Sequence, residues 1–421
     1  MRSLLLWVIL APFVMNAQDP YADVPPPEEK KLEWNGNLDA KYTVFHMAQS
    51  SALYRLQFFS SAPSSAYLSQ YRIEPYLNAD YQTRDAGFHL KTHATYFSDD
   101  NAAFDLFEAY GSFSPSFNLT IQAGKRVFTW GKGYAFNPAG FVNPVKDPEN
   151  PELAQAGLLS ASFEYVKSFS SPQLQTLSFQ VVIIPPSPDL LNRYAEVGNT
   201  AFAVRASALL WDTDIDIMGF YSKSDQRRIG FDFSRNVRGN IEVHAEMSYN
   251  LASPRYSIVS GSLAGARQDQ FSYLFGLRYL HESNSTLIAE YYHSGSGMDR
   301  GEFEAYFDFL TSAAGSGSNA AVQQALGLNQ QYFRGSTLMR DYVYAKLIIP
   351  EPFDILYFTP SLQSIYNIGD GSFLVSASLS YKPVMNVEFI LWPTILTGGR
   401  TSEYGAKMVR ERVEAWLRIF F

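Results

Sequence analysis

Apolar and polar residues alternate along most of the chain from Leu32 onward. In residues 32–44 every second position is apolar or small, and the positions between them include Glu33, Asn35 and Asp39. The same period of two returns in four further runs, at residues 202–210, 241–249, 271–279 and 373–381. Because successive side chains of a strand point to opposite faces, each run predicts a strand with one apolar and one polar face.

The predicted strands are long, and their length separates two kinds of β-protein. They run about ten to fourteen residues, whereas strands of soluble β-sandwiches usually have about five or six. Tilted strands that cross a membrane need about this length and one apolar face. About eighteen such segments occur, near residues 32–46, 69–81, 86–98, 102–112, 116–128, 158–169, 173–184, 200–211, 213–222, 226–235, 239–251, 269–282, 285–294, 338–349, 354–368, 371–382, 384–394 and 407–421.

The gaps between these segments alternate in length. Every second gap is short, as at 82–85, 170–172 and 350–353. The long gaps all fall in the other set, at 47–68, 129–157, 185–199, 252–268, 295–337 and 395–406. Short periplasmic turns and long outer loops are typical of outer-membrane barrels. We therefore predict an all-β fold, a transmembrane antiparallel up-and-down β-barrel of about 18 strands, with 16 as the alternative count.

The C-terminal segment carries a further sign of such a barrel. Val413, Ala415, Leu417, Ile419 and Phe421 form an apolar face that ends the chain on an aromatic residue. This resembles the terminal signature of bacterial outer-membrane barrels, which implies insertion by the barrel assembly machinery through the strand ending at Phe421. The alternative is an ordinary edge strand of a secreted protein.

Composition narrows the class of protein further. Charged residues make up 18% of the 421 residues, below the ~25% usual for soluble proteins. The mean hydropathy is −0.14, and past the N-terminus no apolar run reaches the ~20 residues of a membrane helix. The absence of cysteine excludes disulfides and thiolate metal sites. The net charge of −8 gives no support to nucleic-acid binding.

The N-terminal region predicts export. Arg2 precedes an apolar run from Leu4 to Met15, and Ala17 is a small residue at a plausible cleavage position. We predict a signal peptide at 1–17, a periplasmic linker or tail at 18–31 and the barrel at 32–421. A retained N-terminal anchor is the alternative. The predicted setting is the outer membrane of a Gram-negative bacterium, in contact with its lipid.

The sequence carries no complete motif of catalysis or metal binding. The sequence has no G-x-S-x-G, H-E-x-x-H or Walker loop. His89 and His93 share one face of a predicted strand, but four residues of strand separate them by about 13 Å, too far to share an ion. We therefore predict no enzymatic activity, no metal and no cofactor.

The most distinctive stretch is Ala123–Leu153, which reads AGKRVFTWGKGYAFNPAGFVNPVKDPENPEL. A strand ends in Gly-Lys-Arg, a Trp-Gly-Lys-Gly turn follows, and Asn137-Pro138, Asn143-Pro144 and Asp147-Pro148 come next. This run resembles the loop of porin-like barrels of the alginate-export and related putative-porin families, in which a strand ending in Gly-Arg-Gln is followed by a Trp-Gly turn. Lys125 and Arg126 stand here where those families often have Arg-Gln. The resemblance implies an Asn-Pro-rich loop that enters the barrel.

These residues predict where the lumen narrows. Strand parity turns Arg126 inward, Lys132 lies in the adjoining turn, and Trp130 and Phe136 can hold the loop against the wall. Glu108, Arg205 and Arg278 are predicted to line the same space. The alternative is a loop that folds over the rim and touches no solute. In 295–337, apolar residues from Phe303 to Leu310 recur at helical spacing, and Ala320–Leu328 predicts further helical turns that cap the lumen or decorate the surface.

The predicted function is a porin-like channel through which small hydrophilic solutes diffuse, with the lumen narrowed by loop 129–157. About eighteen strands enclose an aqueous channel. One alternative is an export or assembly barrel for a polysaccharide or periplasmic partner, and another is a surface adhesin carried by the long loops. A homo-oligomer is possible in each case.

Overall fold

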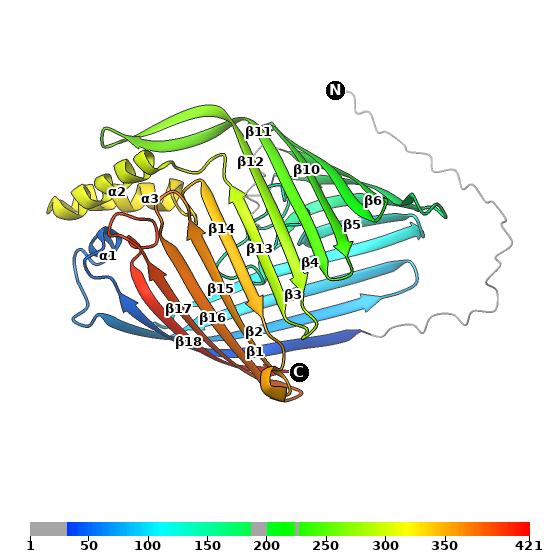
Figure 1. Ribbon diagram of the computed structural model, residues 1–421, viewed down its shortest axis with the longest axis horizontal. Helices are drawn as coiled ribbons and strands as arrows, with labels where there is room; N and C mark the ends of the chain where they lie inside the picture. The colour runs from blue at the N-terminus through cyan, green and yellow to red at the C-terminus, as the bar shows by residue number, and fades with distance from the viewer. Residues whose placement is uncertain (1–31, 187–199, 224–226) are drawn as a thin grey trace, which may run out of the picture.

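The structure is a computed structural model that describes residues 32–186, 200–223 and 227–421, so the predicted signal peptide and linker lie outside the described residues. Eighteen antiparallel strands form one sheet in which each strand pairs with its neighbours in sequence, and β18 pairs with β1 to close the barrel (Figure 1). The strands are β1 (Glu33–Met47), β2 (Tyr67–Gln82), β3 (Ala86–Phe97), β4 (Ala102–Ser116), β5 (Leu119–Arg126), β6 (Leu158–Ser168), β7 (Leu174–Ile184), β8 (Ala201–Leu210), β9 (Thr213–Ser222), β10 (Arg227–Arg238), β11 (Ile241–Val259), β12 (Ser262–Leu280), β13 (Thr286–His293), β14 (Asp341–Ile348), β15 (Phe358–Asn367), β16 (Phe373–Val384), β17 (Val387–Thr397) and β18 (Val409–Phe420). The predicted all-β closed barrel of eighteen strands is confirmed.

The last residue completes the closure. The backbone N–H of Phe421 donates to the carbonyl of Gly36 at 3.1 Å, and the N–H of Gly36 donates to the Phe421 carbonyl at 3.0 Å. A Cβ at position 36 would lie 2.7 Å from the Phe421 ring, so glycine lets the terminal aromatic side chain pack at the seam between β1 and β18. Closure removes the free strand edges that an open sheet would expose.

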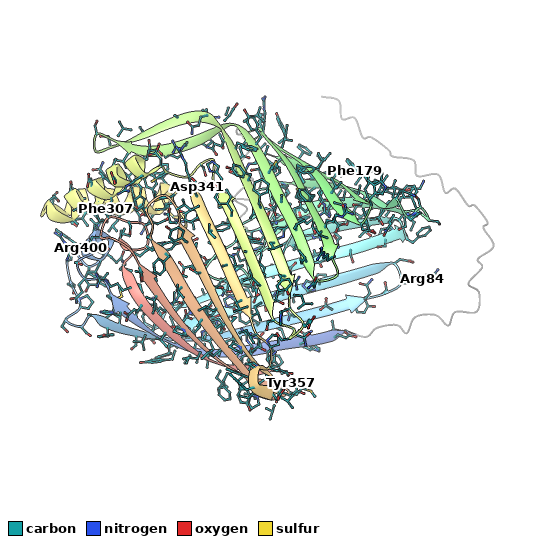
Figure 2. All side chains as sticks on the ribbon, in the orientation of Figure 1. Arg84, Phe179, Phe307, Asp341, Tyr357 and Arg400 are labelled. Carbon is teal, nitrogen blue, oxygen red and sulfur yellow. The ribbon has the colours of Figure 1, made fainter. Side chains whose placement is uncertain are left out.

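The two ends of the barrel differ as the gap lengths predict. Short turns gather at one end, here called the turn end, which carries Arg84 and Tyr357 and the 3-10 turn η2 (Pro352–Asp354). The opposite loop end carries Phe307 and Arg400 (Figure 2). Three helices lie there, α1 (Ala52–Gln57), α2 (Arg300–Gly315) and α3 (Asn319–Tyr332). Among the described residues, no helix is both long and apolar enough to cross a bilayer.

The α2 and α3 helices confirm the helical spacing seen in 295–337. Asp299 and Glu302 form a reciprocal capping box at the start of α2, with both N–H to carboxylate distances at 2.9 Å. The helix α3 extends well beyond the predicted turns. Apolar residues of the three helices pack with the tops of β11–β16 into one buried cluster, which includes Leu56, Tyr306 and Val322.

The prediction of an irregular loop at 252–268 is wrong. Residues Ser253–Val259 pair with Ser262–Gln268, so β11 and β12 continue as a hairpin that projects beyond the barrel wall. Ser260 and Gly261 form its tip with φ of 51° and 75°, the positive angles that two-residue hairpin turns require. Pro254 and the glycines of this segment are unusual within a strand. The strand register also shifts between Asn250 and Ser253, and this shift interrupts the alternation of apolar and polar residues.

Candidate functional site

Residues 127–157, here called the inward loop, connect β5 to β6 and lie against the inner wall of the barrel. Both ends of the loop are tied to β4: the Val127 N–H donates to the Glu108 carboxylate at 3.0 Å, and the Gly157 N–H donates to the Phe107 carbonyl at 2.8 Å. Between these points the loop contacts side chains on β7, β9, β11, β13, β14, β15 and β18.

A buried carboxylate on β11 holds the first part of the inward loop. Glu246 is fully buried, and its oxygens accept the backbone N–H groups of Lys132 at 2.5 Å, of Ala139 at 3.1 Å and also of Gly133. Consecutive N–H groups that converge on one anion form an anion-binding nest. A buried charge with three charge-assisted hydrogen bonds is a strong local anchor.

The glycines of the Trp-Gly-Lys-Gly turn make this nest possible. Gly131 has φ of +87°, and a Cβ there would lie 2.6 Å from a Glu246 oxygen. A Cβ on Gly133 would lie 2.2 Å from the Phe136 carbonyl. Because side chains at either position would collide with the wrapped backbone or with the carboxylate, this part of the motif is explained by the anchor.

A second buried carboxylate holds the next residues. Glu290 on β13 accepts the N–H of Ala135 at 2.9 Å and also that of Tyr134. His244 on β11 lies 3.1 Å from the same Glu290 carboxylate through Nε2. Phe136 stacks on Tyr292 of β13, with ring centroids 4.5 Å apart and planes 16° apart.

The asparagines of two Asn-Pro pairs fix the backbone of Trp130 in the motif. The side chains of Asn137 and Asn143 donate to the Trp130 carbonyl at 2.7 and 2.6 Å, and Asn143 also accepts the Trp130 N–H at 2.9 Å. The indole Nε1 donates to Gln180 of β7 at 2.8 Å. The backbone N–H, the carbonyl and the indole N–H of Trp130 are therefore all hydrogen-bonded, which suits a buried side chain that anchors the loop.

The inward loop covers an apolar patch on the inner face of β6–β9. Phe128, Trp130, Phe141 and Val142 pack with inward-facing residues of β6–β9 in one buried cluster; the wall contributes Leu158, Val182, Ile184, Ala201, Ala203, Met218 and Phe220. These wall residues would otherwise meet water. Their burial against the loop accounts for apolar side chains on the inner face of an aqueous barrel.

A second part of the inner wall is polar, and cavities remain beside it. A cavity of about 460 Å³ and two of about 270 Å³ lie between this wall and the inward loop. Leu153 and Ala154 line all three, so the cavities lie around that part of the loop. The wall residues come mainly from β1–β4 and β14–β18.

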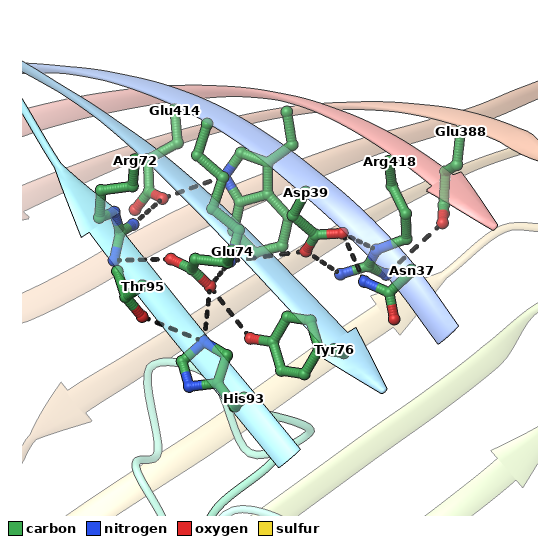
Figure 3. A network of polar contacts seen from close by, with 12 residues as sticks. Asn37, Asp39, Arg72, Glu74, Tyr76, His93, Thr95, Glu388, Glu414 and Arg418 are labelled. Carbon is green, nitrogen blue, oxygen red and sulfur yellow. Dashed lines mark hydrogen bonds and ion pairs between the residues drawn. The ribbon is translucent and has the colours of Figure 1, made fainter. Parts of the chain in front are cut away.

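Dense ion pairing covers the polar wall (Figure 3). Glu74 accepts from Lys41 at 2.7 Å and from the Tyr76 hydroxyl at 3.0 Å, and it lies 3.4 Å from Arg72. Arg418 donates two hydrogen bonds of 2.8 Å to Asp39 and lies 3.6 Å from Glu388. This ladder of opposite charges crosses the seam where β18 meets β1 and stiffens the wall.

Charged side chains of the inward loop also lie inside. Lys146 donates to the Tyr134 carbonyl at 3.0 Å and to that of Gly133. Burial lowers the pKa of Lys146, against the opposing effect of Glu246 and Glu290. Burial raises the pKa of Glu149, and Lys407 and Arg412 oppose that rise.

Six of the seven residues predicted from the sequence lie at or beside the inward loop. Trp130 and Phe136 are the anchors described above, Glu108 holds the start of the loop, and Lys132 lies 3.3 Å from Asp216 of β9. Arg126 has its guanidinium carbon 4.5 Å from the centroid of the Phe128 ring and donates to Ser162 at 3.3 Å. Arg205 lies 3.8 Å from Glu164 and 5.7 Å from the Trp130 ring.

Arg278 lies elsewhere. It lies on the inward-facing side of β12 and pairs with Glu242 near the turn end, whereas Arg126 ends β5 at the loop end.

The two anchoring carboxylates, Glu246 and Glu290, were not predicted from the sequence. Glu246 is an inward residue by strand parity, but its contact with the loop spans more than 100 residues of sequence, so no local pattern could reveal it.

Comparisons with known proteins identify the fold. No family model and no curated protein matches the sequence. The structure of OccK11 (OpdR) from Pseudomonas aeruginosa is similar with a TM-score of 0.54 at 9% identity, covering 92% of this chain and 95% of that one. A BenF-like porin from Pseudomonas fluorescens gives 0.54 at 8% identity, with 93% and 98% covered.

The chain has the fold of a porin-like outer-membrane β-barrel. Wzi of Escherichia coli, described as a carbohydrate-binding β-barrel involved in group 1 capsule assembly, is also similar, with a TM-score of 0.50 at 10% identity over 91% of this chain and 84% of that one. The porin-like barrel predicted from the sequence is thus confirmed. The resemblance of the loop motif to the alginate-export and related families stays a prediction.

Proposed function

We propose that this porin-like barrel is a channel through which small hydrophilic solutes diffuse, and that the inward loop narrows its lumen. The observation that carries the proposal is the division of the inner wall. The loop buries the apolar patch of β6–β9 around Trp130 and is held by the Glu246 and Glu290 anchors, while cavities lie along the polar part of the wall. A water-filled path needs a polar lining and a fixed cross-section.

Arg126, Lys132 and Arg205 are the basic residues of the proposed constriction on the loop side, and Glu108 is its acidic member. Trp130 and Phe136 fix the loop rather than contact the solute, since both are buried. Arg278 lies apart from this constriction, near the turn end. The outer-membrane setting, export by segment 1–17 and insertion through the strand ending at Phe421 belong to the same proposal, and we propose no enzymatic role.

A proteoliposome swelling assay tests this function. Vesicles that contain the protein are diluted into iso-osmotic solutions of neutral solutes of increasing size, from glycerol to trisaccharides. We expect swelling rates that fall steeply with solute size, because the cavities beside the loop are narrow. Vesicles without protein supply the baseline. Rates equal to that baseline for every solute would refute the channel.

An export or assembly role is the second candidate, and two observations favour it. The barrel is similar to Wzi, and helices α1–α3 pack together over the loop end in one buried cluster that reaches Phe136 of the inward loop. A barrel closed by this cap would pass no small solute unless a partner opened it. Swelling at the baseline rate would favour this candidate.

A further inference from the structure

Two indole rings face the cavities from the polar wall. Trp392 of β17 and Trp416 of β18 have ring centroids 5.5 Å apart and planes tilted by 48°. Both rings, together with Tyr76 of β2, line the 460 Å³ cavity and one of its neighbours. They therefore lie where the two cavities meet, opposite Leu153 and Ala154 of the inward loop.

The orientation of these rings is fixed by their N–H groups. The Trp416 Nε1 donates to Glu414 at 3.1 Å, and the Trp392 Nε1 donates to the Ser376 hydroxyl. Lys41 lies 4.1 Å from the centroid of the Trp416 ring. Pinned aromatic rings lose little conformational entropy when a ligand packs against them, so such rings favour binding.

Uncharged hydrogen-bonding groups surround the rings. Thr359 and Ser361 of β15 lie opposite Ser380 and Ser378 of β16 in the strand register, and all four line the 460 Å³ cavity with Asn37 and Asn78 of β1 and β2. A hydroxyl both donates and accepts, and so does an amide. The wall therefore offers adaptable partners for a ligand rich in hydroxyl groups.

The fixed charges at this wall balance. The two cavities that the rings line have equal numbers of bases and carboxylates in their walls. The six bases are Lys41, Arg72, Lys91, Lys346, Arg412 and Arg418, and the six carboxylates are Glu74, Asp147, Glu149, Glu152, Glu388 and Glu414. A wall with six charges of each sign and close pairing attracts neither anions nor cations strongly.

Aromatic faces, hydroxyl partners and balanced charge together match one class of ligand. A sugar ring presents carbon-bound hydrogens on its faces and hydroxyl groups around its rim. Its face can pack on an indole while its rim bonds to serine and asparagine side chains. An aromatic anion would need a base on the wall that is not already paired with a carboxylate. A purely apolar solute would leave the hydroxyl groups of the wall without hydrogen-bond partners.

We propose that Trp392 and Trp416 form a binding site for an uncharged saccharide on the polar wall of the lumen. The site rests on the proposed channel function, because the saccharide reaches it through the lumen. A sugar that passes the inward loop stacks on the two rings in turn and is guided along the wall.

Single-channel recording with added saccharide tests the site. A linear gluco-oligosaccharide of six units is added to one side of a planar bilayer that contains the protein, and transient blockades of the ion current give the affinity. We expect Trp392→Ala and Trp416→Ala each to weaken binding by about two- to ten-fold, the range that a stacking contact supplies. The double variant should be weaker than either. Trp34→Ala is the matched control, because Trp34 is 66% exposed on the outer face of β1.

Two comparisons decide the ligand class. Oligogalacturonate of the same length and benzoate serve as anionic probes, and stronger blockade by either would overturn the assignment of an uncharged saccharide. Unaltered blockade in both tryptophan variants would overturn the site. Shifted gel mobility of unheated samples verifies that each variant forms a closed barrel.

Calorimetric titration of the same saccharide into the detergent-solubilised protein separates this inference from the channel. If the protein conducts ions but neither blockade nor heat of binding is seen, the saccharide site fails and the channel stands. If the protein does not conduct but binds saccharide with the same loss in the tryptophan variants, the channel fails and the site stands.

Discussion

Removal of the Glu246 carboxylate should release the inward loop while leaving the barrel closed. Glu246→Ala strips three backbone N–H groups, those of Lys132, Gly133 and Ala139, of their acceptor. Each buried donor left unpaired costs about 1–3 kcal/mol, so the docked loop loses roughly 3–9 kcal/mol. The barrel itself is held by eighteen strand pairings that do not involve this side chain.

Glu246→Gln supplies an intermediate step. One oxygen remains as an acceptor for Lys132 and Gly133, while the amide nitrogen faces the N–H of Ala139, which the second oxygen accepts at 3.1 Å. The loss is then about 2 kcal/mol, or roughly a thirty-fold change in the ratio of docked to released loop. Glu290 still holds Ala135 in both variants, so release is partial in Glu246→Gln and larger in Glu246→Ala.

Single-channel current measures this release. We expect larger mean conductance and more current noise in the order wild type, Glu246→Gln, Glu246→Ala. Glu242→Ala is the matched control, because Glu242 lies on the same face of the same strand but contacts Ser234 and His244. If Glu246→Ala and Glu242→Ala give the same conductance and noise as the wild type, the loop does not narrow the path and the reasoning is refuted.

Three further outcomes are expected. Gly131→Ala should loosen the loop as Glu246→Gln does, because the new Cβ would lie 2.6 Å from the anchoring carboxylate. Gly327→Ala is the control, since a Cβ at position 327 has no neighbour within 4 Å and should leave the current unchanged. Equal currents in the two variants would contradict the nest. Arg126→Glu should shift the reversal potential in a salt gradient toward the value expected for cation selectivity, and the shift should be larger at low salt, because charges more than ~8 Å apart are screened from each other at physiological ionic strength. Arg126→Lys keeps the positive charge and should not shift the reversal potential. An unchanged potential in both variants removes Arg126 from the constriction. A protease added to intact cells should cut between α2 and α3 at 316–318 and spare 350–353; cleavage at 350–353 without permeabilisation would reverse the predicted orientation.

Local patterns predicted most of the barrel because the membrane and the lumen impose a strict period of two. Each strand must show apolar side chains to lipid and polar ones to water, so the segments 86–98, 158–169 and 213–222 match β3, β6 and β9 within two residues. Helix α2 was also visible, because the apolar residues from Phe303 to Leu310 recur at helical spacing, which is a local signal. The hairpin at 252–268 was missed because Pro254 and a register shift interrupt the alternation.

The site was only partly predictable for a different reason. Strand parity placed Arg126, Glu108 and Arg205 inward, and the Trp-Gly-Lys-Gly motif marked the loop. The two carboxylates that anchor the loop, Glu246 and Glu290, lie more than 100 residues further along the chain, and no spacing in the sequence encodes their contacts with its N–H groups. The pairing of Trp392 with Trp416 likewise depends on the neighbouring positions of β17 and β18 in the closed sheet.

A single-channel recording of the unmodified protein in a planar bilayer tests the central claim most directly. The account predicts stable, step-like currents that rise linearly with voltage and are smaller than those of Glu246→Ala, as expected of a permanent aqueous path beside a docked loop. A membrane that contains correctly closed barrels and yet shows no current steps at any voltage would contradict it.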